Sequence, residues 1–206
     1  MSSEGEFDII SVEFSCYVVK GKAMLRKEII SKKSENFQAV QNLINAAFPP
    51  AEQAPMWFLL HRSSKENIKF NAYYDEEVLV GITYLIIHNQ ICYVTYLAVE
   101  STLQSKGYGT QILDKIKSDY PNYRIVLGIE EEEEDAENNE QRRKRRQFYE
   151  RNGFSSSGNI LKFRAVPFDL LVYGGQCTIK EFFELHKKFL GAIVSTFVKP
   201  KMIVAS

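Results

Sequence analysis

The sequence predicts a mixed α/β fold, an α+β arrangement in which helices cover both faces of one central sheet. Three observations support this prediction. Residues 68–99 contain three apolar runs rich in β-branched and aromatic side chains, separated by short polar segments, as in antiparallel strands joined by tight turns. Segments on either side carry apolar residues at helical spacing. A strand, a helix and a second strand then follow over residues 91–129, which indicates a parallel pair in the same sheet.

The N-terminal part is expected to contain strands followed by two helices. Residues 7–19 and 23–30 are apolar with β-branched and aromatic side chains, which is typical of strands. Over residues 34–48 apolar side chains recur at helical spacing until two consecutive prolines end the run, so a helix is expected there. Residues 56–60 follow a further proline and are expected to form a second, short helix.

The central part is expected to form three antiparallel strands and then a crossover. The antiparallel strands are residues 68–74, 79–87 and 91–99. From Tyr108 onward, apolar residues share one helical face, and a Tyr-Pro pair stops this helix before a short strand at residues 124–129. Parallel pairing is therefore predicted between the strands at 91–99 and 124–129.

The chain is then expected to return to antiparallel strands. A helix is predicted at residues 140–152, and the Asn-Gly pair at its end supplies the left-handed residue that closes helices. Residues 160–165 and 169–173 have strand character and flank residues 166–168, which we interpret as the turn of a hairpin.

The C-terminal part is expected to carry one more helix. Thr178 and Glu181 have the spacing of a capping box before an apolar-faced segment that ends at Gly191. No internal repeat or linker interrupts the sequence. We therefore expect residues 1–206 to form one domain, with a strand extension at 1–22 and a helical extension at 176–206.

Composition limits the class of protein. Hydrophobic residues make up 45% of the chain, which is enough for one well-packed core. Twenty-six basic and 26 acidic side chains cancel, so the overall positive field that attracts nucleic acids or anionic membranes is missing. The first 20 residues lack the pattern of a signal peptide, and a cytoplasmic location is expected. The three cysteines are widely spaced, which argues against a disulfide framework and a zinc site.

The segment from Gln104 to Thr110 is the most informative part of the sequence. It contains Gly107 and Gly109 between a strand and a helix. Glycines let a ligand approach the backbone closely, and the N–H groups at a helix start attract a phosphate. Lys106 adds a positive charge beside this turn. A tight turn without any ligand is the alternative, because the Gly-x-Gly pattern alone is common.

Two other phosphate-binding motifs do not fit. A dinucleotide fingerprint requires a third glycine three positions after Gly109, where this sequence has Ile112. The P-loop string Gly-x-x-x-x-Gly-Lys-Ser/Thr does not occur. Both observations argue against a dinucleotide-dependent enzyme and against nucleotide hydrolysis.

Two motifs in this order resemble the paired signatures of the GNAT superfamily of acyltransferases. The first is Leu-Ala-Val at 97–99 followed by Gln-x-x-Gly-x-Gly at 104–109, and the second is Phe-Tyr-x-x-x-Gly-Phe at 148–154. The resemblance extends over roughly residues 30–175 and is greatest to a bacterial subgroup of unassigned substrate. It implies a mostly antiparallel sheet that splays between the parallel strands at 91–99 and 124–129.

The resemblance also implies a coenzyme A site. The pantetheine arm would lie in the splay and pair with the backbone of one strand, while the glycine turn would surround the diphosphate. The residues implied are Leu97, Ala98, Val99, Gln104, Ser105, Lys106, Gly107, Tyr108, Gly109 and Thr110. The co-substrate would be acetyl-CoA, and no metal is expected because the histidines are isolated.

Catalytic residues follow from the same resemblance. Tyr149 matches the tyrosine that protonates the departing thiolate in many family members, and a packed aromatic residue is the alternative. A carboxylate would deprotonate the amine, with Glu130 the first choice and a solvated surface carboxylate the alternative. Glu52 and Trp57 are assigned to the acceptor side, and the backbone N–H of Val99 to the oxyanion.

Residues 130–137 are mostly acidic, and residues 142–146 are all basic. One explanation is electrostatic: the acids favour the start of the helix and pair with its cations. The other is that the acidic loop attracts a cationic substrate while Arg142 or Arg146 faces the phosphates of the coenzyme.

The sequence therefore predicts an N-acetyltransferase that moves an acetyl group from acetyl-CoA to a primary amine. The acceptor is expected to be a small-molecule amine or a protein lysine or N-terminal amine, with no nucleic-acid or membrane partner. Either terminal extension is a candidate for a homodimer contact or for a cover over the cleft. The alternative function is a non-catalytic acyl-CoA-binding module for sensing or interaction.

Overall fold

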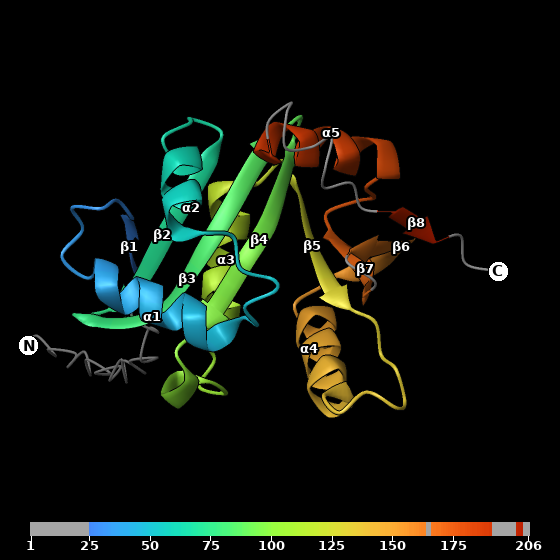
Figure 1. The fold of residues 1–206 in the computed structure, drawn as a ribbon, viewed down its shortest axis with the longest axis horizontal. Coiled ribbons are helices and arrows are strands. Elements are labelled where there is room, and N and C mark those ends of the chain that lie inside the picture. Colours follow the sequence, from blue (N-terminus) through green and yellow to red (C-terminus); the bar gives the residue numbers. More distant parts are fainter. Residues whose placement is uncertain (1–24, 164–165, 191–200, 204–206) are drawn as a thin grey trace, which may run out of the picture.

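A computed structural model describes residues 25–163, 166–190 and 201–203. This part of the chain forms one eight-stranded sheet with the order β1-β2-β3-β4-β5-β7-β6-β8 (Figure 1). The strands are β1 (Arg26–Ile29), β2 (Ile68–Asp75), β3 (Val78–His88), β4 (Ile91–Val99), β5 (Arg124–Glu130), β6 (Ser155–Phe163), β7 (Val166–Tyr173) and β8 (Lys201–Ile203). Only β4 and β5 are parallel, and every other neighbouring pair is antiparallel.

Helices cover both faces of the sheet, as predicted. The helices are α1 (Phe37–Ala47), α2 (Met56–Ser63), α3 (Tyr108–Asp119), α4 (Asn139–Arg151) and α5 (Ile179–Leu190), with a short 3-10 helix at Ser101–Leu103. Buried residues form one cluster beneath α1, α2 and α5 and a second beneath α3 and α4. Figure 1 shows α1 and α2 in front of the sheet and α3 behind it. The strands between them are buried on both sides, which explains their nearly continuous apolar sequences.

One glycine allows α3 to pack closely on the sheet. A Cβ atom at Gly81 in β3 would lie 2.5 Å from the carbonyl oxygen of Ala98 and 2.8 Å from Cδ1 of Ile112. No other residue fits this position without a shift of the backbone. The start of α3 therefore lies close to the end of β4.

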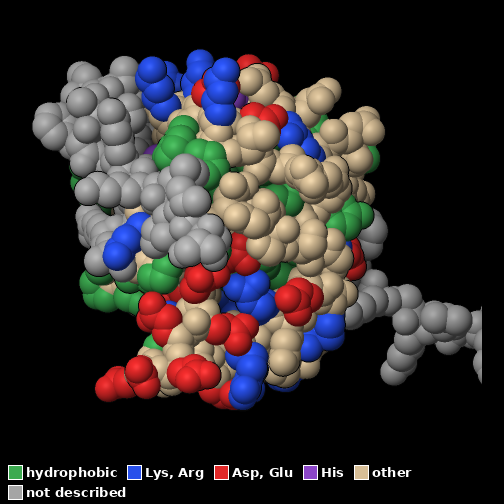
Figure 2. Space-filling model, turned by 90° about the vertical axis from the view of Figure 1, so that its right-hand side faces the viewer, with side chains coloured by type: hydrophobic (Ala, Val, Ile, Leu, Met, Phe, Trp, Pro, Cys, Tyr) green, Lys and Arg blue, Asp and Glu red, His purple; other side chains and the backbone are tan. Residues whose placement is uncertain are grey.

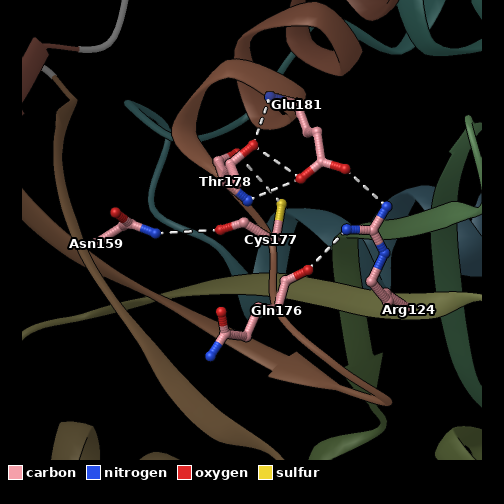
Figure 3. A network of polar contacts seen from close by, with 6 residues as sticks. All are labelled: Arg124, Asn159, Gln176, Cys177, Thr178 and Glu181. Atoms are coloured by element: carbon pink, nitrogen blue, oxygen red, sulfur yellow. Dashed lines mark hydrogen bonds and ion pairs between the residues drawn. The ribbon is translucent and has the colours of Figure 1, made fainter.

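The C-terminal helix begins with the predicted capping box, shown in Figure 3. The backbone N–H and the hydroxyl of Thr178 donate to Glu181 Oε2 at 2.9 and 2.8 Å, and the backbone N–H of Glu181 donates to Thr178 Oγ1 at 3.3 Å. Arg124, at the start of β5, donates to Glu181 Oε1 at 2.8 Å and to the carbonyl oxygen of Gln176 at 2.7 Å. This network attaches α5 to the strand that borders the site.

Three sequence predictions require comment. Residues 166–168 were interpreted as a hairpin turn, but they are the start of β7 and pair with residues 161–163 of β6, so that prediction was wrong. Pro167 is tolerated because it is the second residue of the strand, where a missing N–H costs least, and its carbonyl oxygen accepts from Glu131 N–H at 3.0 Å. The expected helical segment at 176–206 also contains the strand β8. The strand predicted at 7–19 lies outside the described residues.

Candidate active site

The sheet opens between β4 and β5. The two strands pair at only three positions, the last of which joins Tyr93 to Val126. Directly beyond it, Val94 is opposite Leu85 and Tyr96 is opposite Tyr84, so Thr95 is the extra residue of a β-bulge. A bulge bends its strand, and Figure 1 shows β4 and β5 diverging from this point. The predicted splay is therefore confirmed.

The opening contains polar groups that require a ligand. Beyond the last pair, the edges of β4 and β5 that face each other carry backbone amides without a strand partner. The hydroxyl of Thr95 is buried and has no hydrogen-bond partner among the described residues. Buried groups of this kind are normally satisfied. Unpaired strand edges of this kind can accept an extended chain with amide groups as an added strand.

The start of α3 lies at the end of β4 and is open to an anion. Gly107 is its N-cap residue with φ of 86°, no side chain caps the helix, and no acidic residue occurs in its first turn. Ser105 also has a positive φ, of 62°. The amide of Gln104 donates to the carbonyl oxygen of Val99 at 3.4 Å, so the turn folds back onto β4. The uncapped N–H groups and the helix dipole are suited to a diphosphate.

The other residues implied by the resemblance lie in the same turn. Ser105 and Lys106 are exposed, and Tyr108, Gly109 and Thr110 are partly buried. The hydroxyl of Tyr108 donates to Asp75 at 2.6 Å. Lys106 takes part in no ion pair within the described residues, which leaves its ammonium group available to a phosphate.

The second signature packs against the first. A Cβ atom at Gly109 would lie 2.9 Å from the ring of Phe148, so α4 approaches the start of α3 closely. Helix α4 ends in a Schellman motif. The N–H of Phe154 donates to the carbonyl oxygen of Tyr149 at 3.1 Å, and the N–H of Gly153 donates to the carbonyl oxygen of Glu150 at 2.9 Å. Gly153 has φ of 81°. These glycines explain why the spacing of both motifs is constrained.

Tyr149 is held in a fixed position by this packing. Its side chain belongs to the buried cluster on the α3 and α4 face of the sheet, and its ring lies 5.0 Å from that of Phe148 and 5.7 Å from that of Phe154. Burial raises the pKa of Tyr149 to about 12, although Arg145 opposes this effect. The phenol is therefore protonated at neutral pH and is a hydrogen-bond donor.

Glu130 ends β5 at the wide part of the opening. Its carboxylate lies 3.4 Å from Arg142 Nε and 3.8 Å from Arg145 Nη1. The amide of Asn138 donates to the same carboxylate at 3.3 Å. Only 11% of the Glu130 side chain is exposed. Glu130 is therefore part of a cluster that joins β5 to α4.

Three of the basic residues of α4, namely Arg142, Arg145 and Arg146, pair with acidic residues of the 130–137 run. Arg142 donates to the carbonyl oxygen of Glu131 at 2.7 Å. Arg146 forms ion pairs with Glu132 at 3.1 Å and with Asp169, in β7, at 2.8 Å. In Figure 2, acidic and basic side chains intermingle over the lower part of this side of the molecule. These contacts favour the electrostatic explanation of the two charge runs over a contact of Arg142 or Arg146 with phosphates.

Glu52 lies on the loop between α1 and α2. The hydroxyl of Tyr96 donates to the carbonyl oxygen of Glu52 at 2.9 Å and accepts from Ala54 N–H at 2.9 Å. Burial raises the pKa of Glu52, and the charge of Glu130 raises it further. The structure therefore brings these two carboxylates within electrostatic reach of each other.

The structure places the side chain of Trp57 largely in solvent. It is in the first turn of α2, is 66% exposed, and its ring lies 5.9 Å from that of Phe58.

Sequence reasoning missed three residues of the region. Thr95 and Tyr96 were part of an apolar strand pattern, and Asp169 was an ordinary strand residue, so no local signal distinguished them.

The described part of the chain offers neither a candidate metal site nor a membrane-spanning helix. Within residues 25–163, 166–190 and 201–203, no group of three or more His, Cys, Asp or Glu side chains is placed to hold a metal ion. None of the helices described is both long enough and apolar enough to cross a membrane.

The sheet splays between two parallel strands beside an uncapped helix start, an arrangement suited to binding the pantetheine and diphosphate of coenzyme A. Residues 66–156 match the family model of the acetyltransferase (GNAT) domain. This segment of the chain is therefore similar to a GNAT superfamily domain. The matched residues run from the start of β2 to the start of β6 and include both signatures. No curated protein matches the chain in sequence.

Solved structures share this fold. A protein of Bacteroides thetaiotaomicron assigned to the GNAT family has a TM-score of 0.64 and 21% identity, covering 82% of this chain and 98% of its own. An aminoglycoside 6'-N-acetyltransferase with coenzyme A bound has a TM-score of 0.56 and 15% identity, covering 71% and 95%. A variant of spermidine N-acetyltransferase from Vibrio cholerae has a TM-score of 0.55 and 16% identity, covering 82% and 98%. At these identities the similarity establishes the fold.

Proposed function

We propose that this protein is an N-acetyltransferase that moves an acetyl group from acetyl-CoA to a primary amine by direct attack. One observation carries the proposal. The sheet opens directly beside the uncapped start of α3, the phenol of Tyr149 is buried on the α3 and α4 face of the sheet, and Glu130 ends β5 within electrostatic reach of Glu52. These are the groups that aminolysis of a thioester requires.

The chain's own groups have separate binding roles. The backbone of Leu97, Ala98 and Val99 pairs with the pantetheine arm, and the turn at residues 104–110 binds the diphosphate. The backbone N–H of Val99 is proposed to stabilise the oxyanion. Acetyl-CoA supplies the thioester whose C–S bond is broken.

Two proton transfers involve side chains. Tyr149 donates a proton to the sulfur that leaves, and a carboxylate accepts a proton from the incoming ammonium, which is almost fully protonated at neutral pH. The sequence assigned the second role to Glu130. The nitrogen–carbon bond forms as the carbon–sulfur bond breaks, and the net reaction releases one proton to solvent.

The acceptor is proposed to be a small-molecule amine. Two proteins of the same fold are named for acetylation of spermidine and of aminoglycosides. Their sequences are only 16% and 15% identical to this one, so spermidine and aminoglycosides are candidate acceptors to be tested. A protein lysine or N-terminal amine is the other candidate. The cytoplasmic location, the homodimer and the single domain over residues 1–206 stay predictions.

The test is release of free thiol from acetyl-CoA with a panel of amines. The panel contains spermidine, kanamycin, free amino acids and a lysine peptide, and calorimetry measures coenzyme A binding in parallel. Amine-dependent thiol release supports the proposal. Binding of coenzyme A without release with any amine favours the alternative, a non-catalytic acyl-CoA-binding module.

A further inference from the structure

The two carboxylates at the wide end of the opening differ in their partners. Glu130 is paired with Arg142 and Arg145 and accepts from Asn138. Within the described residues, the carboxylate of Glu52 takes part in no ion pair and no hydrogen bond. A carboxylate that is already paired with guanidinium groups must give up those contacts before it receives a proton. Glu52 has no such contacts to lose.

The position of Glu52 is nevertheless fixed. Its own carbonyl oxygen and the N–H of Ala54 both bond to the hydroxyl of Tyr96 at 2.9 Å. The amide of Gln53 donates to the carbonyl oxygen of Phe48 at 2.7 Å, and the ring of Phe48 lies 4.8 Å from that of Tyr96. Tyr96 directly follows the bulge in β4. The loop is therefore attached to the strand at the point where the sheet opens.

Glu52 and Tyr149 approach the opening from opposite faces of the sheet. Tyr96, which holds the Glu52 loop, belongs to the buried cluster beneath α1 and α2. Tyr149 belongs to the cluster beneath α3 and α4.

From this arrangement we infer that Glu52 is the general base of the proposed acetyl transfer and that Glu130 is a positioning residue. The inference rests on the proposed function and revises the role that the sequence gave to Glu130. The ammonium of the acceptor passes one proton to the Glu52 carboxylate, which becomes a carboxylic acid. The neutral amine then attacks the thioester carbon, the carbon–sulfur bond breaks, and Tyr149 protonates the sulfur. The second proton of the amine nitrogen returns to the Tyr149 phenolate, and Glu52 releases its proton to solvent.

The charges around Glu52 support this role. Burial is the largest cause of its raised pKa, Glu130 raises the pKa further, and Arg145 and Arg142 lower it. The pKa of Glu52 is higher in the folded protein than in the unfolded chain, so protonated Glu52 favours folding more than ionised Glu52 does. This contribution is present at low pH and is lost as the pH rises through the folded-state pKa. At neutral pH the ionised carboxylate is therefore a destabilising group that the fold retains.

Activity with spermidine as the probe amine tests the assignment. Glu52→Gln is expected to lower kcat/KM by roughly 10²- to 10⁴-fold, the range for loss of a general base. The loss should shrink as the pH approaches the amine pKa of about 10, because more of the amine is then neutral. Glu130→Gln should show no such recovery at high pH, and the acidic limb of its pH profile should move to lower pH because the charge that raises the pKa of Glu52 is removed. A Glu52→Gln enzyme with wild-type kcat/KM, or with a loss independent of pH, overturns the assignment.

Thermal melts provide a readout that needs no acceptor. At pH 8 the Glu52→Gln protein should melt above the wild type, and the difference should shrink toward pH 4. The Glu130→Gln protein should melt below the wild type, because Arg142 has only 9% of its side chain exposed and loses a partner. A lower or unchanged melting temperature for Glu52→Gln at pH 8 overturns the inference. Failure of the wild type to acetylate any amine while binding coenzyme A refutes the proposed function instead.

Discussion

Arg146 is predicted to hold α4, and with it Tyr149, against the sheet. Its Nη1 atom lies 2.8 Å from Oδ2 of Asp169, a residue that is only 2% exposed. Arg146→Met leaves that buried carboxylate with one hydrogen bond, from the hydroxyl of Ser156 at 2.7 Å. Breaking a buried pair by removing one partner costs about 3–5 kcal/mol. Because 21% of the Arg146 side chain is exposed, we expect the lower end, about 3 kcal/mol.

The measurement is a thermal melt followed by circular dichroism. For a chain of this length a loss of about 3 kcal/mol lowers the melting temperature by roughly 6–12 °C. The double variant Arg146→Met/Asp169→Asn should recover much of the loss, because the unpaired charge is removed. Arg143→Met is the matched control, since Arg143 is exposed and, among the described residues, its ion pair is with Glu140 on its own helix. It should change stability by less than about 1 kcal/mol.

Coenzyme A titration completes this test. Calorimetry should give the same affinity for the folded Arg146→Met protein as for the wild type. An Arg146→Met protein with an unchanged melting temperature and weakened coenzyme A binding would refute the reasoning, because Arg146 would then contact the phosphates.

Three further predictions concern the acid and the C-terminal helix. Tyr149→Phe keeps the ring packing, so kcat should fall by roughly 10²- to 10⁴-fold with an unchanged melting temperature; wild-type turnover would exclude Tyr149 as the acid. Thr178→Ala removes a helix cap and should lower stability by about 1 kcal/mol, or roughly 2–4 °C in a thermal melt; no shift would contradict the cap. Hydrogen bonds from Arg124 and Thr178 hold the pKa of Glu181 at about 2, below the usual 4.5. The melting-temperature difference between wild type and Glu181→Gln should therefore be present above pH 4.5 and close as the pH falls toward 2, whereas a constant difference would count against this pairing.

The elements that the sequence predicted well are those with local causes. The helix over residues 34–48 and the capping box at Thr178 depend on periodicity and on residues three positions apart, and both agree with the structure. The turn at residues 104–110 was also predictable from local sequence, because Gly107 adopts a positive φ that few other residues tolerate.

What the sequence could not predict depends on partners far along the chain. The bulge at Thr95 is defined by the register of β4 against β3. The apolar pattern of residues 91–99 predicts a strand but does not indicate a bulge. The approach of Glu52 to Glu130 depends on Tyr96 holding one loop beside the end of β5. Pro167 was interpreted as a turn residue, whereas pairing with Lys162 of β6 places it in a strand. β8 is three residues long, too short to give a recognisable pattern.

The central claim is that the opening between β4 and β5, together with the start of α3, binds coenzyme A. Isothermal titration of coenzyme A into the full chain tests it most directly. The account predicts saturable heat with one molecule bound per chain, and much weaker binding of pantetheine, which lacks the diphosphate that the turn at residues 104–110 would contact. A folded protein that gives no heat with coenzyme A would contradict the account.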